Sequence, residues 1–193
     1  MHKTPRVSIQ MADFDVGAEI ATLRAGDHRV GAVCSFIGTV RDRNVAPTLP
    51  AARGSLPPGG AHFALGRPDG ETQAPTLPAV EAVLTMELEH YPGMTEKAIE
   101  VMIDEAHRRF DIFGARVIHR IGLLQPPDQI VLVVVTSAHR GESFKACEFL
   151  MDYLKTQAPF WKKEQTAAGA HWVDARVSDD VALARWGIQS SNA

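Results

Sequence analysis

Apolar residues follow two different periods along this chain, and the periods divide it into expected strands and helices. Apolar residues alternate with polar ones, or form an unbroken block, in several short runs, which is typical of strands. The longest block, residues 130–135 (IVLVVV), is rich in β-branched residues and is too short for a membrane span, so it indicates a buried strand. The expected strands are residues 7–11, 30–40, 80–91, 116–121 and 129–137, with shorter extended pieces at 160–164 and 171–174.

Helical spacing of apolar residues predicts three longer helices and one short one. The first runs from a cap at Asp15 to about Arg24, and the second covers residues 96–109 after Thr95. The third covers about residues 142–156 and is stopped by Pro159. We expect it to bury Phe144, Cys147, Leu150, Met151 and Leu154. A last short helix is expected between a cap at residues 178–180 and Trp186.

The order of these elements predicts an α+β fold with a largely antiparallel sheet and packed helices. Its 193 residues, with 45% hydrophobic and 22% charged, suit a single domain over residues 1–193. Residues 45–79 differ from the rest because they hold seven of the twelve prolines and five glycines. Neither a helix nor a central strand can run through such a segment, so we expect a mobile insert with weak docking points at Phe63 and Leu65.

Charge and cysteine content narrow the classes of function. The net charge of −3 argues against a surface for nucleic acid, and no apolar run reaches the length of a membrane span. No secretory signal is visible at the start, so we expect a cytoplasmic protein. Cys34 and Cys147 are too few for a disulfide framework and read as core residues, and the histidines form no ligand pair. We expect neither a metal site nor a cofactor.

Candidate chemistry rests on cations at the ends of elements, because phosphate-loop, dinucleotide and nucleophile-elbow motifs are missing from the sequence. Arg41 follows an expected strand, and His139 and Arg140 lie between a strand and a helix, where backbone N–H groups favour anions. A solvated loop is an equally simple explanation of that pair. Lys155 falls in the last turn of a helix, where the dipole alone can account for it. Lys162 and Lys163 are neighbours in an extended stretch and should point to opposite faces.

Five blocks of sequence carry a resemblance to a known family. They are residues 36–41 (FIGTVR), 88–97 (LEHYPGMTEK), 117–122 (VIHRIG), 135–140 (VTSAHR) and 151–164 (MDYLKTQAPFWKKE). In this order they resemble the large, catalytic subunit of molybdopterin synthase, and they span nearly the whole chain outside the insert. The resemblance implies an α/β hammerhead-like fold. The family usually has a short connection where this chain has its insert, so the insert could shield the pocket or be an inert loop.

The resemblance also implies an activity, partners and a site. Members of the family transfer sulfur to cyclic pyranopterin monophosphate, forming the dithiolene of molybdopterin. The sulfur comes from a thiocarboxylate at the C-terminal Gly-Gly of a small sulfur-carrier subunit, and two large subunits form a homodimer within a heterotetramer. The substrate-binding positions fall on Thr39, Val40, Arg41, His139, Arg140, Lys155, Lys162, Lys163 and Glu164. Lys155 is expected to be the central catalytic group, and Lys162 is expected to orient the intermediate.

Two other interpretations remain open from the sequence. The chain could be a non-catalytic paralogue that binds the small subunit or a phosphorylated pterin without converting it, although the intact lysine pair weighs against this. Composition and spacing alone support only a small-anion-binding α+β domain. Whether the chain is an enzyme or only binds its ligands, part of each pocket could come from the second protomer of the dimer.

Overall fold

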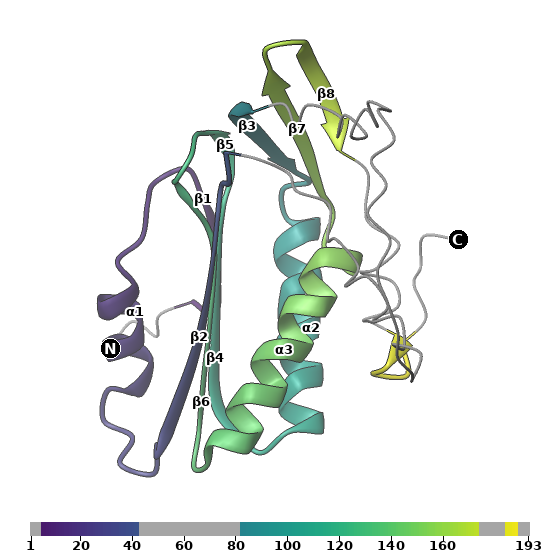
Figure 1. Ribbon diagram of the computed structural model, residues 1–193. Helices are drawn as coiled ribbons and strands as arrows, with labels where there is room; N and C mark the ends of the chain where they lie inside the picture. The colour runs from purple at the N-terminus through teal and green to yellow at the C-terminus, as the bar shows by residue number, and fades with distance from the viewer. Residues whose placement is uncertain (1–4, 43–81, 174–183, 189–193) are drawn as a thin grey trace, which may run out of the picture.

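The computed structural model describes residues 5–42, 82–173 and 184–188, and Figure 1 shows their arrangement. The helices are α1 (Val16–Arg24), α2 (Met94–Arg109) and α3 (Arg140–Gln157). The strands are β1 (Val7–Gln10), β2 (Ala32–Thr39), β3 (Val83–His90), β4 (Ile112–Arg120), β5 (Gly122–Leu124), β6 (Gln129–Ser137), β7 (Phe160–Thr166) and β8 (Gly169–Val173). The predicted strands and the three longer predicted helices are therefore present, and β5 is a short strand that the sequence pattern did not predict.

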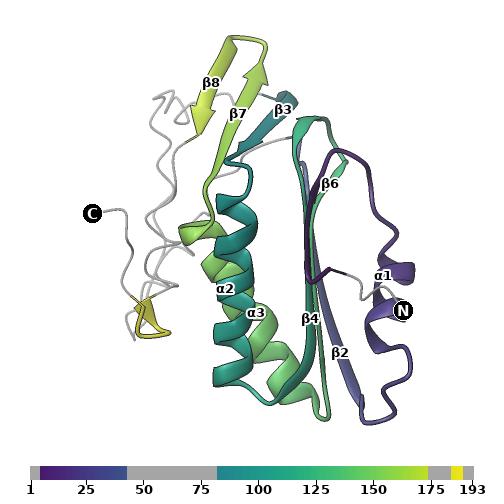
Figure 2. The ribbon, with the colours of Figure 1, turned by 180° about the vertical axis from the view of Figure 1, so that it is seen from behind.

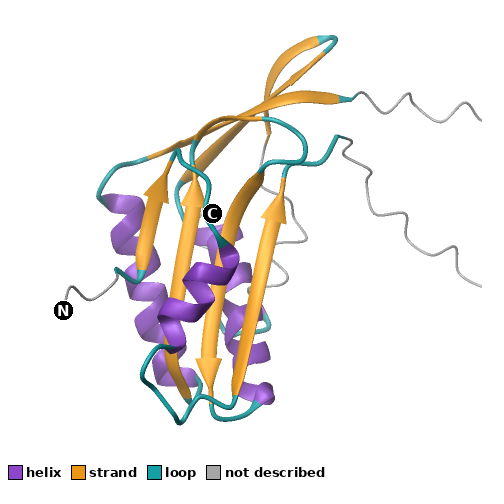
Figure 3. Cartoon of the chain, turned by 90° about the vertical axis from the view of Figure 1, so that its left-hand side faces the viewer, coloured by secondary structure: helices purple, strands orange, loops and turns teal. Residues whose placement is uncertain are grey.

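The strands form two four-stranded sheets rather than the single sheet that the sequence predicted. The first has the order β1-β4-β6-β2, and the second has the order β5-β3-β7-β8. Strands β1 and β4 are parallel, and every other pairing is antiparallel. The prediction of an α+β fold with largely antiparallel pairing is confirmed. Figure 3 shows the second sheet beyond one end of the first.

Helices cover both faces of the first sheet. Figures 1 and 2 show α2 and α3 on one face and α1 on the other. Strand β6 explains this layering, because Val131, Val133 and Val135 join the main core with α2 and α3. The residues between them, Leu132 and Val134, join a second cluster with α1 residues. The unbroken apolar block at 130–135 therefore belongs to a strand that is buried on both faces.

A third apolar cluster lies where the two sheets meet. It contains Val40, which follows β2, together with Met86, Leu88 and Leu124 from β3 and β5. The backbone N–H of Val40 donates to the carbonyl of Asp128 at 2.9 Å, which keeps this residue beside the start of β6. The segment just after β2 is thus a fixed part of the junction between the sheets.

The helix starts follow local hydrogen bonding. Asp15 caps α1 as predicted, and its carboxylate accepts from the N–H of Ala18 at 2.9 Å. Helix α2 begins at Met94, slightly before the predicted start, because the Glu96 carboxylate accepts from the N–H of Gly93 at 2.6 Å. Thr95 does not act as the cap and is fully buried. No helix in the described ranges is long and apolar enough to span a membrane.

The buried face of α3 differs from the prediction at two phenylalanines. Phe144 was expected in the core but is 58% exposed, whereas Phe149, which was not predicted, is fully buried. The ring of Phe149 contacts Phe110 just after α2 and Trp186 near the C-terminus, with centroids 5.7 and 5.5 Å away. Because α3 packs against α2 as well as the sheet, its buried face is turned toward α2 and away from Phe144. The other predicted residues, Cys147, Leu150 and Leu154, are buried, and Met151 is half-buried.

Two predicted features lie outside the described residues. The insert at residues 45–79, with Phe63 and Leu65, is one of them. The other is the cap at residues 178–180 of the expected last helix, of which only the end near Trp186 is described.

The contrast between the two phenylalanines predicts a difference in stability. Phe149→Ala leaves a cavity among buried aromatic rings and should lower the free energy of unfolding by about 3–5 kcal/mol. Phe144→Ala, on the same helix, removes an exposed ring and should change it by less than about 0.5 kcal/mol. Urea denaturation of both variants measures this. Equal losses would contradict the observed orientation of α3.

Candidate functional site

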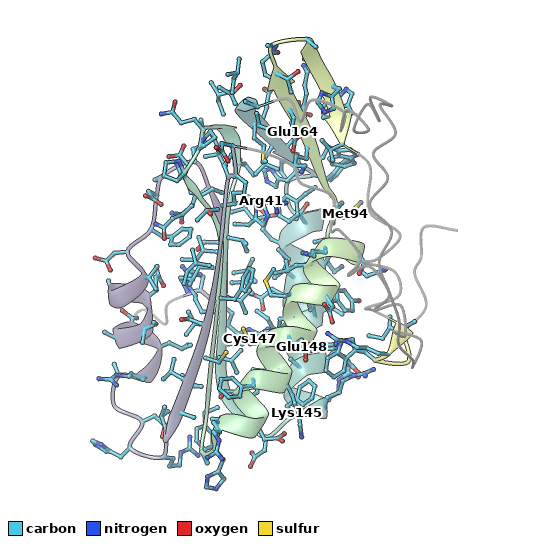
Figure 4. All side chains as sticks on the ribbon, in the orientation of Figure 1. Arg41, Met94, Lys145, Cys147, Glu148 and Glu164 are labelled. Carbon is cyan, nitrogen blue, oxygen red and sulfur yellow. The ribbon has the colours of Figure 1, made fainter. Side chains whose placement is uncertain are left out.

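The residues after β2 place one predicted cation at the junction of the sheets. Thr39 and Arg41 are exposed, while Val40 between them is buried in the junction cluster. This alternation fixes the backbone through Val40 and directs its two neighbours outward. Figure 4 shows Arg41 at the end of the first sheet that lies next to the second sheet. The substrate-binding prediction for Thr39 and Arg41 therefore concerns exposed side chains, whereas Val40 serves mainly as an anchor.

Lys155 lies close to the same end of the molecule. It is exposed in the last turn of α3, between the buried residues Leu154 and Thr156. Only Ala158 and Pro159 separate the end of α3 from the start of β7, which carries Lys162. The structure therefore connects the two predicted catalytic lysines through a bend of two residues.

Lys162 forms an ion pair with a buried carboxylate. Its Nζ lies 2.9 Å from Oε1 of Glu164, which is only 2% exposed, while the Lys162 side chain is 30% exposed. The two residues point to the same face of β7 because they are two apart on a strand. A buried carboxylate needs such a partner, and the pair holds the ammonium group in a defined place.

Lys163 points to the other face of the second sheet, as the sequence predicted for one of the two lysines. Its Nζ lies 5.6 Å from the centre of the Trp172 ring, in a cation–π contact across the β7–β8 pair. Lys163 is therefore separated from the Lys162–Glu164 pair, although both lysines were predicted to bind substrate.

His139 and Arg140 lie at the opposite end of α3. They are exposed, and His139 is the N-cap residue of α3, between β6 and α3 as the sequence predicted. Arg140 and Lys155 are fifteen positions apart in one continuous helix, which is about 22 Å along the helix axis. The antiparallel register agrees, since β2 pairs Ala32 with Ser137 but Thr39 with Gln129. Within one chain, the predicted site thus divides into two groups of cations at opposite ends of the first sheet.

His171 belongs to the lysine end, and sequence reasoning missed it. Its Nε2 lies 3.7 Å from Oε2 of Glu164, whereas Lys162 contacts the other carboxylate oxygen, Oε1. A signal was available in the sequence, since a two-residue loop at Ala167 and Ala168 sets the β7–β8 register. Pairing Thr166 with Gly169 places His171 directly opposite Glu164.

His119, another histidine that the sequence analysis did not use, lies beneath the bend between α3 and β7. Its ring stacks on Phe160 with centroids 3.8 Å apart and an interplanar angle of 17°. Its Nδ1 lies 2.8 Å from the carbonyl oxygen of Arg120, which favours a proton on that nitrogen. Desolvation of the ring, helped by the nearby His90, lowers the pKa of His119 from 6.5 to about 4, against the opposing effect of the Arg120 carbonyl. His119 is therefore neutral at physiological pH.

The two cysteines lie at the interface of β2 and α3. Cys147 is buried in the main core, and Cys34 packs against it as a half-buried residue. Burial raises the pKa of the Cys147 thiol, and the neighbouring Cys34 raises it further. Cys147 therefore remains a thiol at neutral pH, which agrees with the interpretation of a core residue rather than a nucleophile.

The chemistry available at the lysine end is the binding and stabilisation of anions. Arg41 offers a planar pair of N–H donors for phosphate or carboxylate, and the two lysines add compact positive charges. Among the described residues, no group of three or more histidine, cysteine or carboxylate side chains could hold a metal ion. What this end can do follows from its cations and from Glu164, which orients one of them.

Comparisons with known proteins agree on one family. A family model described as MoaE protein matches residues 73–157. The molybdopterin synthase catalytic subunit of Ralstonia nicotianae is 56% identical over 189 residues, covering 98% of this chain and 88% of that protein. The solved structure of the molybdopterin biosynthesis MoaE protein from Burkholderia ambifaria has a TM-score of 0.67 and 45% identity, covering 95% of this chain and 98% of that one.

A more distant structure shares the fold. It is the protein–protein complex of subunits 1 and 2 of the molybdopterin-converting factor from Helicobacter pylori. The matched chain has a TM-score of 0.59 and 15% identity, with 89% of this chain and 92% of that chain covered. At this identity the likeness concerns the fold alone.

The lowered pKa of His119 predicts a pH dependence of stability. The unfolded chain takes up a proton on this histidine below about pH 6.5, whereas the folded protein does so only near pH 4. Stability should therefore fall as the pH decreases from 6.5 to 4, by up to about 3 kcal/mol from this group. His119→Phe should remove that part of the decrease in urea titrations at pH 7 and pH 4.5. An identical decrease in the variant and the wild-type protein would show that His119 is not the group responsible.

Proposed function

The chain belongs to the MoaE family, the catalytic subunits of molybdopterin synthase, and from this premise we propose how its residues transfer sulfur. The donor is the thiocarboxylate at the C-terminal Gly-Gly of a small sulfur-carrier subunit, and the acceptor is cyclic pyranopterin monophosphate. The product is the dithiolene of molybdopterin. The relatives are named as catalytic subunits, which favours the enzyme over a non-catalytic paralogue. We place the reaction in the cytoplasm.

The observation that carries the proposal is the grouping of Arg41, Lys155 and Lys162 at the end of the molecule where the two sheets meet. Arg41 follows the anchored Val40, and the two lysines flank the bend between α3 and β7. The glutamate of the second sheet, Glu164, holds Lys162 at 2.9 Å. The segment after β2, the end of α3 and strand β7 thus each supply one of the positive charges that a phosphorylated substrate and an anionic tail require.

The chemistry explains why cations serve this reaction. When sulfur moves from the tail to the pterin, a carbon–sulfur bond forms on the pterin and the acyl–sulfur bond of the tail breaks. Oxygen from water replaces the sulfur on the tail, which then ends in a carboxylate. The thiocarboxylate, the product carboxylate and the substrate phosphate are all anionic, so fixed positive charge stabilises each stage.

The residues take different parts in this scheme. Lys155, which is exposed at the C-terminal end of α3, contacts the end of the tail and acts as an acid, a base or a stabilising charge. Lys162, held by Glu164, orients the intermediate, and Arg41 binds the phosphate or the pterin. No protein thiol takes part, in agreement with the burial of Cys147.

His139 and Arg140 enter the same site from a second copy of the chain. One chain holds them about 22 Å along α3 from Lys155, too far to bind the same small molecule. In a twofold dimer the two ends of neighbouring subunits can meet, and each copy then supplies one group of cations to each of two sites. We therefore propose a homodimer with composite sites, with a small subunit at each end of a heterotetramer.

The role of Lys155 gives the first functional prediction. Lys155→Ala should abolish formation of molybdopterin from cyclic pyranopterin monophosphate and the thiocarboxylated small subunit, while leaving the unfolding midpoint nearly unchanged. The matched control is Arg24→Ala, which also removes a cation from the last turn of a helix but lies on α1, across the sheet from α3. It should keep normal turnover. Near-normal turnover by Lys155→Ala would refute the proposed role.

The composite site predicts complementation between two inactive variants. Arg140→Ala and Lys155→Ala should each be inactive as homodimers. After dissociation and random reassociation, half of the dimers contain both variants and have one intact site each. The mixture should therefore recover about a quarter of wild-type activity. A mixture that stays inactive would mean that Arg140 and Lys155 do not meet across the dimer.

A further inference from the structure

The bend between α3 and β7 is the shortest path between the two predicted catalytic lysines, and it is held from two sides. The bend consists of Ala158 and Pro159 and leads directly into Phe160. Its own backbone makes one local contact, from the N–H of Phe160 to the carbonyl of Ala158 at 2.9 Å. Two residues from other elements, Thr95 of α2 and His119 of β4, hold it in addition.

Thr95 links the bend to the start of α2 through its hydroxyl group. The hydroxyl donates to the carbonyl oxygen of Pro159 at 3.1 Å and accepts from the N–H of Tyr91 at 3.1 Å. Thr95 is fully buried, so water cannot replace either bond. Proline has no N–H, so the carbonyl is the only backbone group through which Pro159 can be held by a hydrogen bond.

His119 holds the other side of the bend through its ring. The imidazole lies nearly parallel to the ring of Phe160 at a centroid distance of 3.8 Å, and the bond between Nδ1 and the Arg120 carbonyl fixes its orientation. In the second sheet, Phe160 also pairs with His90. The first residue of β7 is thus fixed both to the first sheet and to β3.

We propose that Thr95 and His119 are positioning residues that hold Lys155 and Lys162 in one relative arrangement for sulfur transfer. The inference rests on the function proposed above, because it concerns how the two lysines act together. Neither residue touches the substrate in this account. Each acts through Pro159 or Phe160, and so through the direction in which the chain leaves α3 and enters β7.

Sulfur transfer by two lysines requires that they are held in a fixed relative position. Lys155 has the tail as its partner, and Lys162 has the intermediate, so both ammonium groups must reach one reacting centre. A displacement of about 1 Å in such a pair can cost a factor of about 100 in rate. Glu164 fixes Lys162 relative to β7, and the packing of α3 against α2 and the first sheet fixes the backbone at Lys155. The bend joins α3, which carries Lys155, to β7, which carries Lys162.

Single-turnover kinetics on the Thr95 series test the inference. Thr95→Val keeps the shape but leaves the Pro159 carbonyl without its donor, so the rate of sulfur transfer should fall about tenfold or more. Thr95→Ser keeps the hydroxyl and should restore most of the rate. The affinity for the small subunit should change little in either variant, because Thr95 is buried and cannot contact that subunit.

A matched control separates positioning from general stability. Val134→Ala removes buried methyl groups on the face of the first sheet that packs against α1, away from the bend. It should lower the unfolding midpoint but keep the wild-type rate per folded molecule. If Thr95→Val also keeps the wild-type rate per folded molecule, its role is structural and the inference is overturned.

The His119 side is tested with two further variants. His119→Phe keeps a ring that can stack on Phe160 and should keep most of the rate, whereas His119→Ala removes the stacked ring and should slow transfer about as much as Thr95→Val. Equal rates for the alanine and phenylalanine variants, both at the wild-type level, would remove His119 from the proposal.

A measurement of geometry distinguishes failure of this inference from failure of the proposed function. Spin labels are attached at Lys155→Cys and Lys162→Cys in a background with Cys34→Ala and Cys147→Ala. Adding Thr95→Val should broaden the distribution of distances between the labels, and adding Val134→Ala should not. A distribution that stays narrow with Thr95→Val overturns the inference. A broadened distribution with an unchanged rate of sulfur transfer also overturns it, whereas normal turnover by Lys155→Ala would count against the proposed function instead.

Discussion

The packing of α3 against the first sheet is the constraint on which the candidate site depends. Val133 and Val135 of β6 and Leu150 of α3 are fully buried in one core. This contact fixes the direction of α3 and its position along the sheet. The two ends of α3 then determine where Lys155 and Arg140 lie. Lys155 is held at the junction of the two sheets, and Arg140 is held at the far end. A rigid helix of this length cannot bring both to one ligand, so the fold of one chain favours a site shared by two.

The second sheet completes the lysine end with a different kind of interaction. A glutamate that is almost completely buried costs free energy unless it is paired, and Lys162 and His171 each lie near one of its two carboxylate oxygens. The pair thus restricts a flexible lysine that would otherwise sample many rotamers. Arg41 is directed outward from the same junction because Val40 beside it is buried. Hydrophobic anchoring thus fixes the backbone beside Arg41, and the buried ion pair restricts the side chain of Lys162.

Much of the fold could be predicted from the sequence, because its signals are local. The apolar block of β6, the Asp15 cap and the break at Pro159 each act over a few residues, and the structure confirms them. The division into two sheets could not be predicted in this way. It depends on how Val40 packs with Met86 and Leu124, which are distant in the sequence. The sequence predicted Phe144 rather than Phe149 in the core for a similar reason. Helical spacing does not show that α2 covers one flank of α3.

The sequence supplied the candidate site residues but not their arrangement. The resemblance identified the cations, and strand geometry correctly separated Lys162 from Lys163. The contact of Thr95 with Pro159 crosses a bend, and no spacing in the sequence displays it. The contact of His171 crosses a hairpin, and only the register of that hairpin could have indicated it. The distance between the two groups of cations follows from the length of α3, and the antiparallel register of β2 and β6 agrees with it.

The central claim is that the end of a donor tail reaches the lysine group at the junction of the sheets. A structure of this chain in complex with a small partner ending in Gly-Gly tests it most directly. The account predicts that the terminal carboxylate lies within hydrogen-bonding distance of Nζ of Lys155, at about 3 Å, with Lys162 close by. A tail that ends elsewhere, such as on the Trp172 face of the second sheet, would contradict it.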